Sequence, residues 1–246
     1  MKINLFAALF MSLSVCCTAQ AGVLAAKTRI IFNAGEREQS LMLANTNQYS
    51  IILQTWIDQG EGSPEATDMP FLVLPPVMKM PSEGVQGIRI IYNGKPLPAD
   101  RETVFWLNLY EIPMIKQHKD QDSYISLAMN TQLKLFYRPK QMVKMSPEAI
   151  ADKLEFTIRQ ENGHAYLECN NETPYHASLI NLRLTQAEYS IAAQSEMDMM
   201  SYPYAKKRYV LDGTLSAQTG YILQFDLLDD QGNAQPFQKN LAPIQP

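Results

Sequence analysis

Short runs rich in isoleucine, valine, leucine, tyrosine and threonine recur along the chain, separated by turn residues. Large apolar residues in these runs alternate with small or polar ones, as expected for strands that bury one face. This spacing is typical of an antiparallel β-sandwich of the immunoglobulin type. Long amphipathic helical patterns are absent, so we predict an all-β protein. The runs of the first half are "TRIIFNAG", "SLMLANTN", "SIILQTWID", "FLVLPP", "GIRIIYNG" and "TVFWLNLYEI".

The first 21 residues have the features of a secretory signal peptide. They contain one lysine near the start, an apolar stretch and an Ala-Gln-Ala ending, which predicts cleavage after Ala21. The apolar stretch is too short to span a membrane, and no later segment approaches the ~20 apolar residues that a spanning helix needs. We therefore expect an exported protein that does not insert into the membrane.

Charge, length and cysteine content narrow the class of the mature protein. Removing 21 of the 246 residues leaves 225, with 20 basic and 25 acidic side chains, because Lys2 is the only charge lost. This balance does not suit a nucleic-acid-binding protein, which needs clustered lysine and arginine. Cys169 is the only cysteine of the mature chain, so no internal disulfide can form. The length is comfortable for two domains.

The strand-like pattern breaks after Pro139, in the segment "PKQMVKMSPEAIADK". There Ser146, Pro147 and Glu148 look like the cap and first turn of a short helix. A second strand-rich set follows, with weaker patterning between Gln186 and Lys206 and no convincing internal repeat. We predict a first domain over residues 22–142 and a second over residues 143–246. The runs of the second half are "KLEFTIRQ", "HAYLECN", "HASLINLRL", "KRYVL" and "GYILQFDLLDDQG".

The sequence contains no recognisable catalytic or cofactor motif. His118, His164 and His176 lie in different predicted elements and have no ligand spacing with one another or with Cys169. No nucleophile elbow, phosphate-binding loop or zinc-protease motif is present. We therefore predict a protein that is not an enzyme and that holds no metal or cofactor. Without a nucleotide site, any role in assembly must draw its free energy from folding and binding.

The stretch "SYISLAMNTQLKLFYRP", residues 123–139, combines an apolar row with unusual length. Large apolar side chains occupy one set of alternate positions, and mostly small or polar ones lie between them. A strand of roughly 17 residues far exceeds the usual length of about five or six. From the residues alone, two readings stay open: the row packs in its own core, or part of it serves another chain.

Five segments of the first domain resemble the PapD-like family, the periplasmic chaperones of the chaperone-usher pilus pathway. They occur in the family's order with similar gaps, whereas in the second domain the match thins to "LDDQG". The resemblance implies two immunoglobulin-like domains in a boomerang arrangement, located in the periplasm. The matching segments are "TRIIF" (28–32), "QTWID" (54–58), "LPPVMKMPSEGVQGIRI" (74–90), "DRETVFWLNLYEIP" (100–113) and "QLKLFYRP" (132–139).

The family resemblance assigns a function to the long apolar row. Members of this family bind pilus or fimbrial subunits that lack their final strand, and deliver them to an outer-membrane usher. The chaperone lends its own strand to complete the subunit, a case of strand addition. By this alignment the donor side chains are Ile125, Leu127 and Met129. The exposed row is an aggregation hazard, which the resemblance implies is limited in the free protein by self-association or by loop cover.

Two cations match the family's anchor for a carboxylate. Arg29 in "KTRIIF" and Lys134 in "QLKLFYRP" correspond to the pair that holds the C-terminal carboxylate of the subunit. A guanidinium and an ammonium that converge on one carboxylate form charge-assisted hydrogen bonds. From the residues alone, the alternative is that both are solvated cations on strands.

A second charged group corresponds to the cluster that the family places between its domains. Glu102, Arg138 and Asp230 match this cluster, and Asp229 competes for the third position. Arginine can hold carboxylates in a bidentate geometry that lysine cannot copy. The resemblance implies a structural role, in which the cluster fixes the angle of the cleft.

The segment before the proposed donor strand indicates a subclass. The nine residues "MIKQHKDQD" at 114–122 are short, which resembles the short-loop subclass. A structural fibre subunit or adhesin is the alternative function, but it should contain one incomplete sandwich and an N-terminal donor extension. An exported hydrolase or carbohydrate-binding module would need a catalytic or aromatic constellation that the sequence does not offer.

Overall fold

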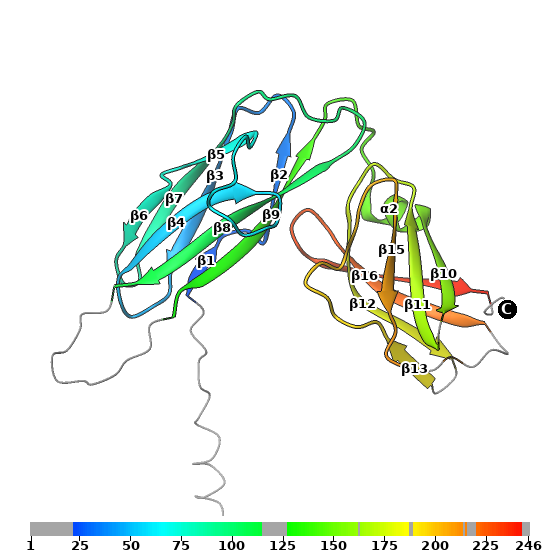
Figure 1. Cartoon of the computed structure of the whole chain (residues 1–246). Helices are drawn as coiled ribbons and strands as arrows, with labels where there is room; N and C mark the ends of the chain where they lie inside the picture. The colour runs from blue at the N-terminus through cyan, green and yellow to red at the C-terminus, as the bar shows by residue number, and fades with distance from the viewer. Residues whose placement is uncertain are drawn as a thin grey trace, which may run out of the picture.

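The computed structural model describes residues 22–114, 127–161, 163–186, 189–213, 215 and 220–242. It contains two β-sandwiches that meet at an angle (Figure 1). The predicted all-β class with two immunoglobulin-like domains is confirmed. The predicted signal peptide, His118 and Ile125 lie outside the described residues. Within the described part of the chain, no helix is long and apolar enough to cross a membrane.

The first domain packs two sheets face to face. The strand order is β1-β3-β7-β5 in one sheet and β2-β9-β8-β4-β6 in the other. The first sheet consists of β1 (Val23–Ala25), β3 (Glu38–Asn45), β7 (Val85–Tyr92) and β5 (Phe71–Leu74). The second consists of β2 (Arg29–Asn33), β9 (Met129–Arg138), β8 (Thr103–Pro113), β4 (Ile51–Asp58) and β6 (Val77–Met80).

The core of this domain follows from the alternation of side chains. In β4, Ile51, Leu53 and Ile57 are buried, because residues two positions apart in a strand share one face. Between the sheets, the ring of Phe71 lies edge-on to Phe32, with 5.0 Å between the centroids. Each fully buried side chain of this size contributes about 1.5–3 kcal/mol relative to exposure.

Strand β9 is shorter than the sequence pattern predicts. It begins at Met129 and not at residue 123; Leu127 and Ala128 are described but belong to no strand, and residues 123–126 lie outside the described part. On one side β9 pairs with β8 from Met129 to Tyr137. On the other side β2 pairs with it only from Lys134 to Arg138. Among the described residues, the Met129–Leu133 portion of β9 therefore has one unpaired edge.

The second domain also packs two sheets, and each predicted run overlaps a strand. A three-stranded sheet, β10-β11-β15, faces a sheet in which β13, β12, β16 and β17 are successive neighbours and β14 pairs with β12. The three-stranded sheet consists of β10 (Leu154–Glu161), β11 (His164–Asn171) and β15 (Ala205–Val210). The other consists of β13 (Tyr189–Ala192), β12 (Ala177–Gln186), β16 (Tyr221–Leu228), β17 (Ala234–Leu241) and β14 (Met200–Ser201).

The short helix α2 (Pro147–Lys153) follows the linker between the domains. The hydroxyl of Ser146 accepts a hydrogen bond from the backbone N–H of Ala149 at 3.3 Å, and Pro147 starts the helix. The predicted cap is confirmed. Ile150 and Ala151 are buried in the second core, so the helix belongs to the second domain.

One buried asparagine in each domain holds a loop in the same way. In the first domain, Asn45 Nδ2 donates to the carbonyl oxygens of Tyr49 at 3.0 Å and Pro81 at 2.8 Å. Its Oδ1 accepts from the backbone N–H of Asn47 at 3.0 Å. The asparagine thereby satisfies backbone groups that would otherwise be buried without partners.

Asn171 repeats this pattern in the second domain. Its Nδ2 donates to the carbonyl oxygens of Tyr175 at 2.8 Å and Tyr202 at 3.0 Å. Its Oδ1 accepts from the backbone N–H of Thr173 at 3.0 Å. The partners two and four residues downstream are equivalent in the two domains, although no convincing repeat is visible in the sequence.

Replacing Asn171 with alanine should lower the free energy of unfolding of the second domain by about 2–4 kcal/mol, because buried carbonyl groups lose their donor. Urea denaturation followed by circular dichroism measures this loss. Asn170→Ala is the control, since its side-chain bonds to Glu155 and Glu172 are exposed. Equal stability of the two variants would contradict the prediction.

Candidate functional site: the cleft between the domains

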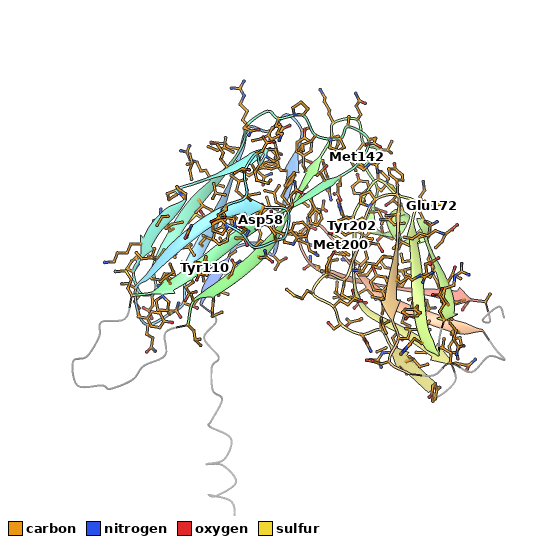
Figure 2. All side chains as sticks on the ribbon, viewed as in Figure 1. Asp58, Tyr110, Met142, Glu172, Met200 and Tyr202 are labelled. Carbon is orange, nitrogen blue, oxygen red and sulfur yellow. The ribbon has the colours of Figure 1, made fainter. Side chains whose placement is uncertain are left out.

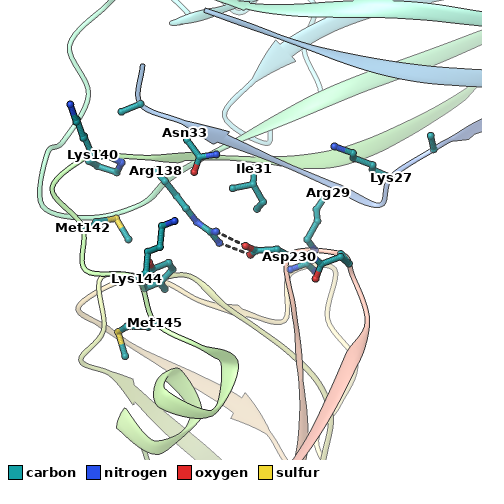
Figure 3. A pocket seen from close by; sticks show the side chains of 15 residues that line it. Lys27, Arg29, Ile31, Asn33, Arg138, Lys140, Met142, Lys144, Met145 and Asp230 are labelled. Carbon is teal, nitrogen blue, oxygen red and sulfur yellow. Dashed lines mark hydrogen bonds and ion pairs between the residues drawn. The ribbon is translucent and has the colours of Figure 1, made fainter. Parts of the chain in front are cut away.

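A cleft of about 880 Å³ lies between the domains, beside strand β2 and the linker (Figure 3). Its basic side chains outnumber its acidic ones in a chain whose formal net charge is −4. A concentration of one charge in a concave site favours ligands of the opposite charge. The basic residues of the lining are Lys27, Arg29, Arg138, Lys140 and Lys144, and the acidic one is Asp230.

Arg138, at the end of β9, connects the first domain to the second (Figure 3). Its two terminal nitrogens donate to the two carboxylate oxygens of Asp230 at 2.5 and 2.6 Å. Its Nε donates to Glu102 Oε1 at 2.6 Å. Burial alone would lower the pKa of Arg138, but the hydrogen bonds and charges of these carboxylates outweigh burial and raise it. Glu102 and Asp230 therefore both contact Arg138 directly.

Glu102 also contacts the second domain through its other oxygen. Oε2 accepts from the backbone N–H of His176 at 2.8 Å and lies 3.1 Å from the ring nitrogen Nδ1. The carboxylate is almost fully buried, so these bonds offset the cost of removing a charge from water. His176 therefore belongs to this interface, where the sequence alone had given it no role.

The two neighbouring aspartates of the "LDDQG" turn have different partners. Asp229 Oδ1 accepts from the backbone N–H groups of Gln231 at 2.9 Å and Asn233 at 2.8 Å, which closes the turn. Gly232 has a φ of 86°, and a side chain there would collide with Thr28 of the first domain. The turn therefore packs closely against the first domain, and Asp230 is the carboxylate that contacts Arg138.

Arg29 and Lys134 lie side by side on neighbouring parallel strands, as register partners of β2 and β9. Among the described residues, Arg29 makes only long hydrogen bonds, from Nη1 to Ser178 Oγ at 3.5 Å and to the Leu228 carbonyl at 3.4 Å. Its Nε is buried without a partner. Burial lowers the pKa of Arg29, against the opposing effect of nearby carboxylates. This guanidinium thus has unused donor capacity.

Lys134, in contrast, has a close partner from the second domain. Its Nζ lies 3.0 Å from Asp198 Oδ1. Burial raises the pKa of Asp198, but the hydrogen bond and charge of Lys134 outweigh burial and hold that pKa below its ordinary value. The sequence analysis did not identify Asp198.

A small apolar cluster forms the contact beneath these charges. Val104 and Phe136 of the first domain pack with Met200 of the second, and Ile31 and Trp106 border them. Met200 is fully buried here. The contact gives the two domains an apolar interface in addition to the ion pairs.

The proposed donor row is divided between solvent and the protein's own core. The side chains of Leu127 and Met129 are 73% and 52% exposed, whereas Leu133 and Leu135 are buried in the first domain. Ile125 is not described. The exposed end of the row coincides with the unpaired edge of β9.

A polar network supports the same part of β9 from the other face of the sheet. Asn108 Nδ2 donates to buried Asp58 at 2.9 Å. Asn108 Oδ1 accepts from Asn130 Nδ2 and from Gln132 Nε2, each at 2.9 Å. These bonds order polar side chains of β9 beside its unpaired edge (Figure 2 labels Asp58).

Both domains match models of one protein family. The model described as "Pili and flagellar-assembly chaperone, PapD N-terminal domain" matches residues 22–143, and "Pili assembly chaperone PapD, C-terminal domain" matches residues 149–239. The chaperone protein FimB/FhaD of Bordetella pertussis is 34% identical over 230 residues, covering 91% of this chain and 90% of the relative. The chaperone protein FimC of Escherichia coli is 32% identical over 176 residues, covering 71% and 70%.

Solved structures show the same fold. The YadV chaperone superposes with a TM-score of 0.76 at 25% identity, covering 90% of this chain and 100% of that one. A chain from the Salmonella enterica SafA pilin in complex with the SafB chaperone gives a TM-score of 0.71 at 25% identity, covering 89% and 95%. Because the two family models together match most of the sequence, this chain belongs to the PapD family of periplasmic pilus-assembly chaperones, which are binding proteins and not enzymes.

Proposed function

We propose that this protein binds a pilus or fimbrial subunit by adding β9 to it, and then delivers the subunit to an outer-membrane usher. The subunit is a sandwich that lacks its last strand, and β9 with the residues before it completes that sandwich. Transfer follows when the donor segment of the next subunit displaces the chaperone strand. The observation that carries this proposal is the unpaired edge of β9 beside its exposed apolar residues.

The unpaired edge supplies the main-chain part of the recognition. From Met129 to Leu133, one row of backbone N–H and C=O groups has no strand beside it among the described residues. Such a row is a template for a strand from another chain. A subunit strand placed there would extend the sheet beyond the point where β2 ends.

The exposed apolar side chains supply affinity and register. Leu127 and Met129, with Ile125 before them, would each contribute on the order of 1.5–3 kcal/mol if fully buried in the groove of a subunit. A shift by one residue would present Ala128 and Asn130 instead. This difference selects one register. The same residues would favour self-association of the free protein.

Arg29 and Lys134 are the proposed anchor for the terminal carboxylate of the subunit. They are register partners at the point where β2 meets β9, so one carboxylate can lie against both side chains. The unused donors of Arg29 suit an anion with two oxygens. Holding the end of the subunit strand at this point would set the register for the residues that follow along β9.

The contact of Arg138 with Glu102 and Asp230 has a structural role in this proposal. The anchor lies in β2 and β9, whereas its surroundings include Ser178 and Asp198 of the second domain. The angle between the domains therefore determines the shape of the anchor site. Three nitrogens of Arg138 donate to two carboxylates, and this planar arrangement fixes the angle better than a single ammonium nitrogen could.

Delivery to an usher requires a surface that stays free while a subunit occupies β9. The outward face of the sheet β1-β3-β7-β5 is such a surface, since β2 and β9 belong to the other sheet of the first domain. We assign the usher contact to this face. Its exposed apolar residues are Leu24, Met42, Leu72, Leu74 and Val85.

We also assign the protein to the short-loop subclass of the family. The sequence places nine residues, 114–122, between the end of β8 and the predicted donor stretch. Such a length is associated with rod-forming pili or other complex surface fibres.

Leu127→Asp should abolish recovery of the subunit, because it places a charge where an apolar side chain must enter the groove. Affinity purification of the tagged protein from periplasm, followed by mass spectrometry, measures recovery. Val77→Asp is the matched control, since it adds the same charge at an apolar residue that is 55% exposed on β6, at the far edge of the same sheet, and it should retain the subunit. Full recovery with Leu127→Asp would exclude β9 as the donor.

Arg29→Ala should also lose the subunit while circular dichroism shows a folded protein, because the carboxylate loses its guanidinium partner. Arg37→Ala, which removes an exposed arginine of the same domain, should bind normally. The same purification compares both variants with the wild type. A folded Arg29→Ala protein that still recovers the subunit would rule out the anchor.

Arg138→Ala should lower the free energy of unfolding by about 3–5 kcal/mol, since buried Glu102 loses its charged partner. Arg138→Lys should restore only part of this loss, because one ammonium cannot bond to both carboxylates in the same geometry. Urea denaturation measures stability, and small-angle X-ray scattering measures the angle between the domains. Arg89→Ala breaks an exposed pair with Glu38 inside the first domain and should leave both measurements unchanged; a similar result for Arg138→Ala would contradict the structural role.

A further inference from the structure

Lys134, one half of the proposed anchor, already contacts a carboxylate of this chain. Asp198 Oδ1 lies 3.0 Å from Lys134 Nζ, and the two side chains are 34% and 23% exposed. A carboxylate on an ammonium is the same interaction that the terminus of a subunit would make. The two carboxylates therefore compete for one cation.

The second domain holds Asp198 in this position. Asp198 Oδ1 accepts from the backbone N–H of Met200 at 3.1 Å, and Oδ2 accepts from the hydroxyl of Tyr202 at 3.2 Å. Met200 itself pairs with Ser178 in β12 and is buried against Phe136. The carboxylate is thus placed by residues that are fixed on both sides of the domain interface.

A second ammonium lies close to Asp198. Lys207 Nζ contacts the backbone oxygen of Asp198 and lies 3.5 Å from Glu196 Oε2. Its charge helps to lower the pKa of Asp198. If the Asp198 carboxylate leaves Lys134, it does not lose all of its favourable charge interactions.

Among the described residues, no carboxylate forms an ion pair with Arg29 as Asp198 does with Lys134. Its hydrogen bonds to Ser178 and Leu228 are long, and its Nε has no partner. The proposed anchor is therefore unequal: the guanidinium has free donors, whereas the ammonium is already paired.

We propose that Asp198 is an internal competitor for the anchor, which occupies Lys134 in the free protein and is displaced by the terminal carboxylate of a subunit. This inference rests on the proposed anchoring by Arg29 and Lys134. Displacement breaks one ion pair and brings two carboxylates near each other, which opposes binding. Asp198 thereby weakens the hold on the subunit and eases its release.

The test uses the full mature protein and a pair of synthetic peptides. Both peptides have the same alternating apolar sequence and a fluorescent label; one ends in a free carboxylate and the other in an amide. Fluorescence anisotropy gives the dissociation constants for the wild type, Asp198→Asn and Glu196→Gln. Glu196→Gln is the matched control, because it removes a charge of the same segment that pairs with Lys207. Thermal unfolding monitored by circular dichroism checks that each variant is folded.

Asp198→Asn should bind the carboxylate peptide about tenfold more tightly, since both the internal pair and the repulsion are removed. Binding of the amide peptide should be unchanged, and Glu196→Gln should resemble the wild type for both peptides. Equal or weaker binding of the carboxylate peptide by Asp198→Asn would overturn the competitor role, as would equal tightening for both peptides.

The wild-type comparison tests the anchor separately. A wild-type preference for the carboxylate that Asp198→Asn leaves unchanged would overturn the competitor and keep the anchor. A preference that appears only in Asp198→Asn would support the competitor. No preference in either protein would overturn both.

Discussion

The contact of Arg138 with Glu102 and Asp230 is the interaction that we propose fixes the geometry of the cleft. Two charge-assisted hydrogen bonds join Arg138 at the end of β9 to Asp230 of the second domain. A third holds Glu102 of the first domain, which in turn accepts from the backbone N–H of His176. Lys134 and Met129 lie on the same strand as Arg138, about 13 Å and 30 Å away at the usual rise per residue. One strand therefore carries the contact between domains, half of the proposed anchor and the start of the proposed donor row. A change in the domain angle would move Asp198 and Ser178 relative to Lys134 and Arg29.

The unpaired edge of β9 results from the path of the chain near its start. Strand β1 pairs with β3 in one sheet, and β2 pairs with β9 in the other, so the chain changes sheets between Ala25 and Arg29. Because β2 begins only at Arg29, it covers the Lys134–Arg138 part of β9 and leaves the rest open. Such an edge normally favours aggregation. The proposed pairing with a subunit strand would explain why this edge stays open beside exposed Leu127 and Met129.

Local patterns predicted most of the fold, whereas the site depended on contacts that no local pattern reports. The strand β4 and the cap at Ser146 are visible in short stretches of sequence. Strand β17 was missed because it alternates exposed and half-buried residues and contains Pro236. Strand β9 was predicted too long because the alternation of apolar and polar residues also extends to the residues before Met129. The pairing with β8 ends at Met129, which lies opposite Glu111 near the end of β8. Asp198 comes from a poorly patterned segment 64 residues after Lys134, and nothing in its neighbourhood marks it.

A chaperone that passes its subunit on must bind reversibly, and the described features limit its affinity. Among the described residues, the open edge of β9 covers Met129–Leu133, so this part of the proposed main-chain pairing is short. If the terminal carboxylate of a subunit binds as proposed, Lys134 loses its ion pair with Asp198, while Arg29 gains a hydrogen-bond partner. In the proposed transfer, better binding of the incoming strand drives the exchange. An anchor with one free and one occupied cation suits such exchange, because the terminal carboxylate gains less on binding than it would from two free cations.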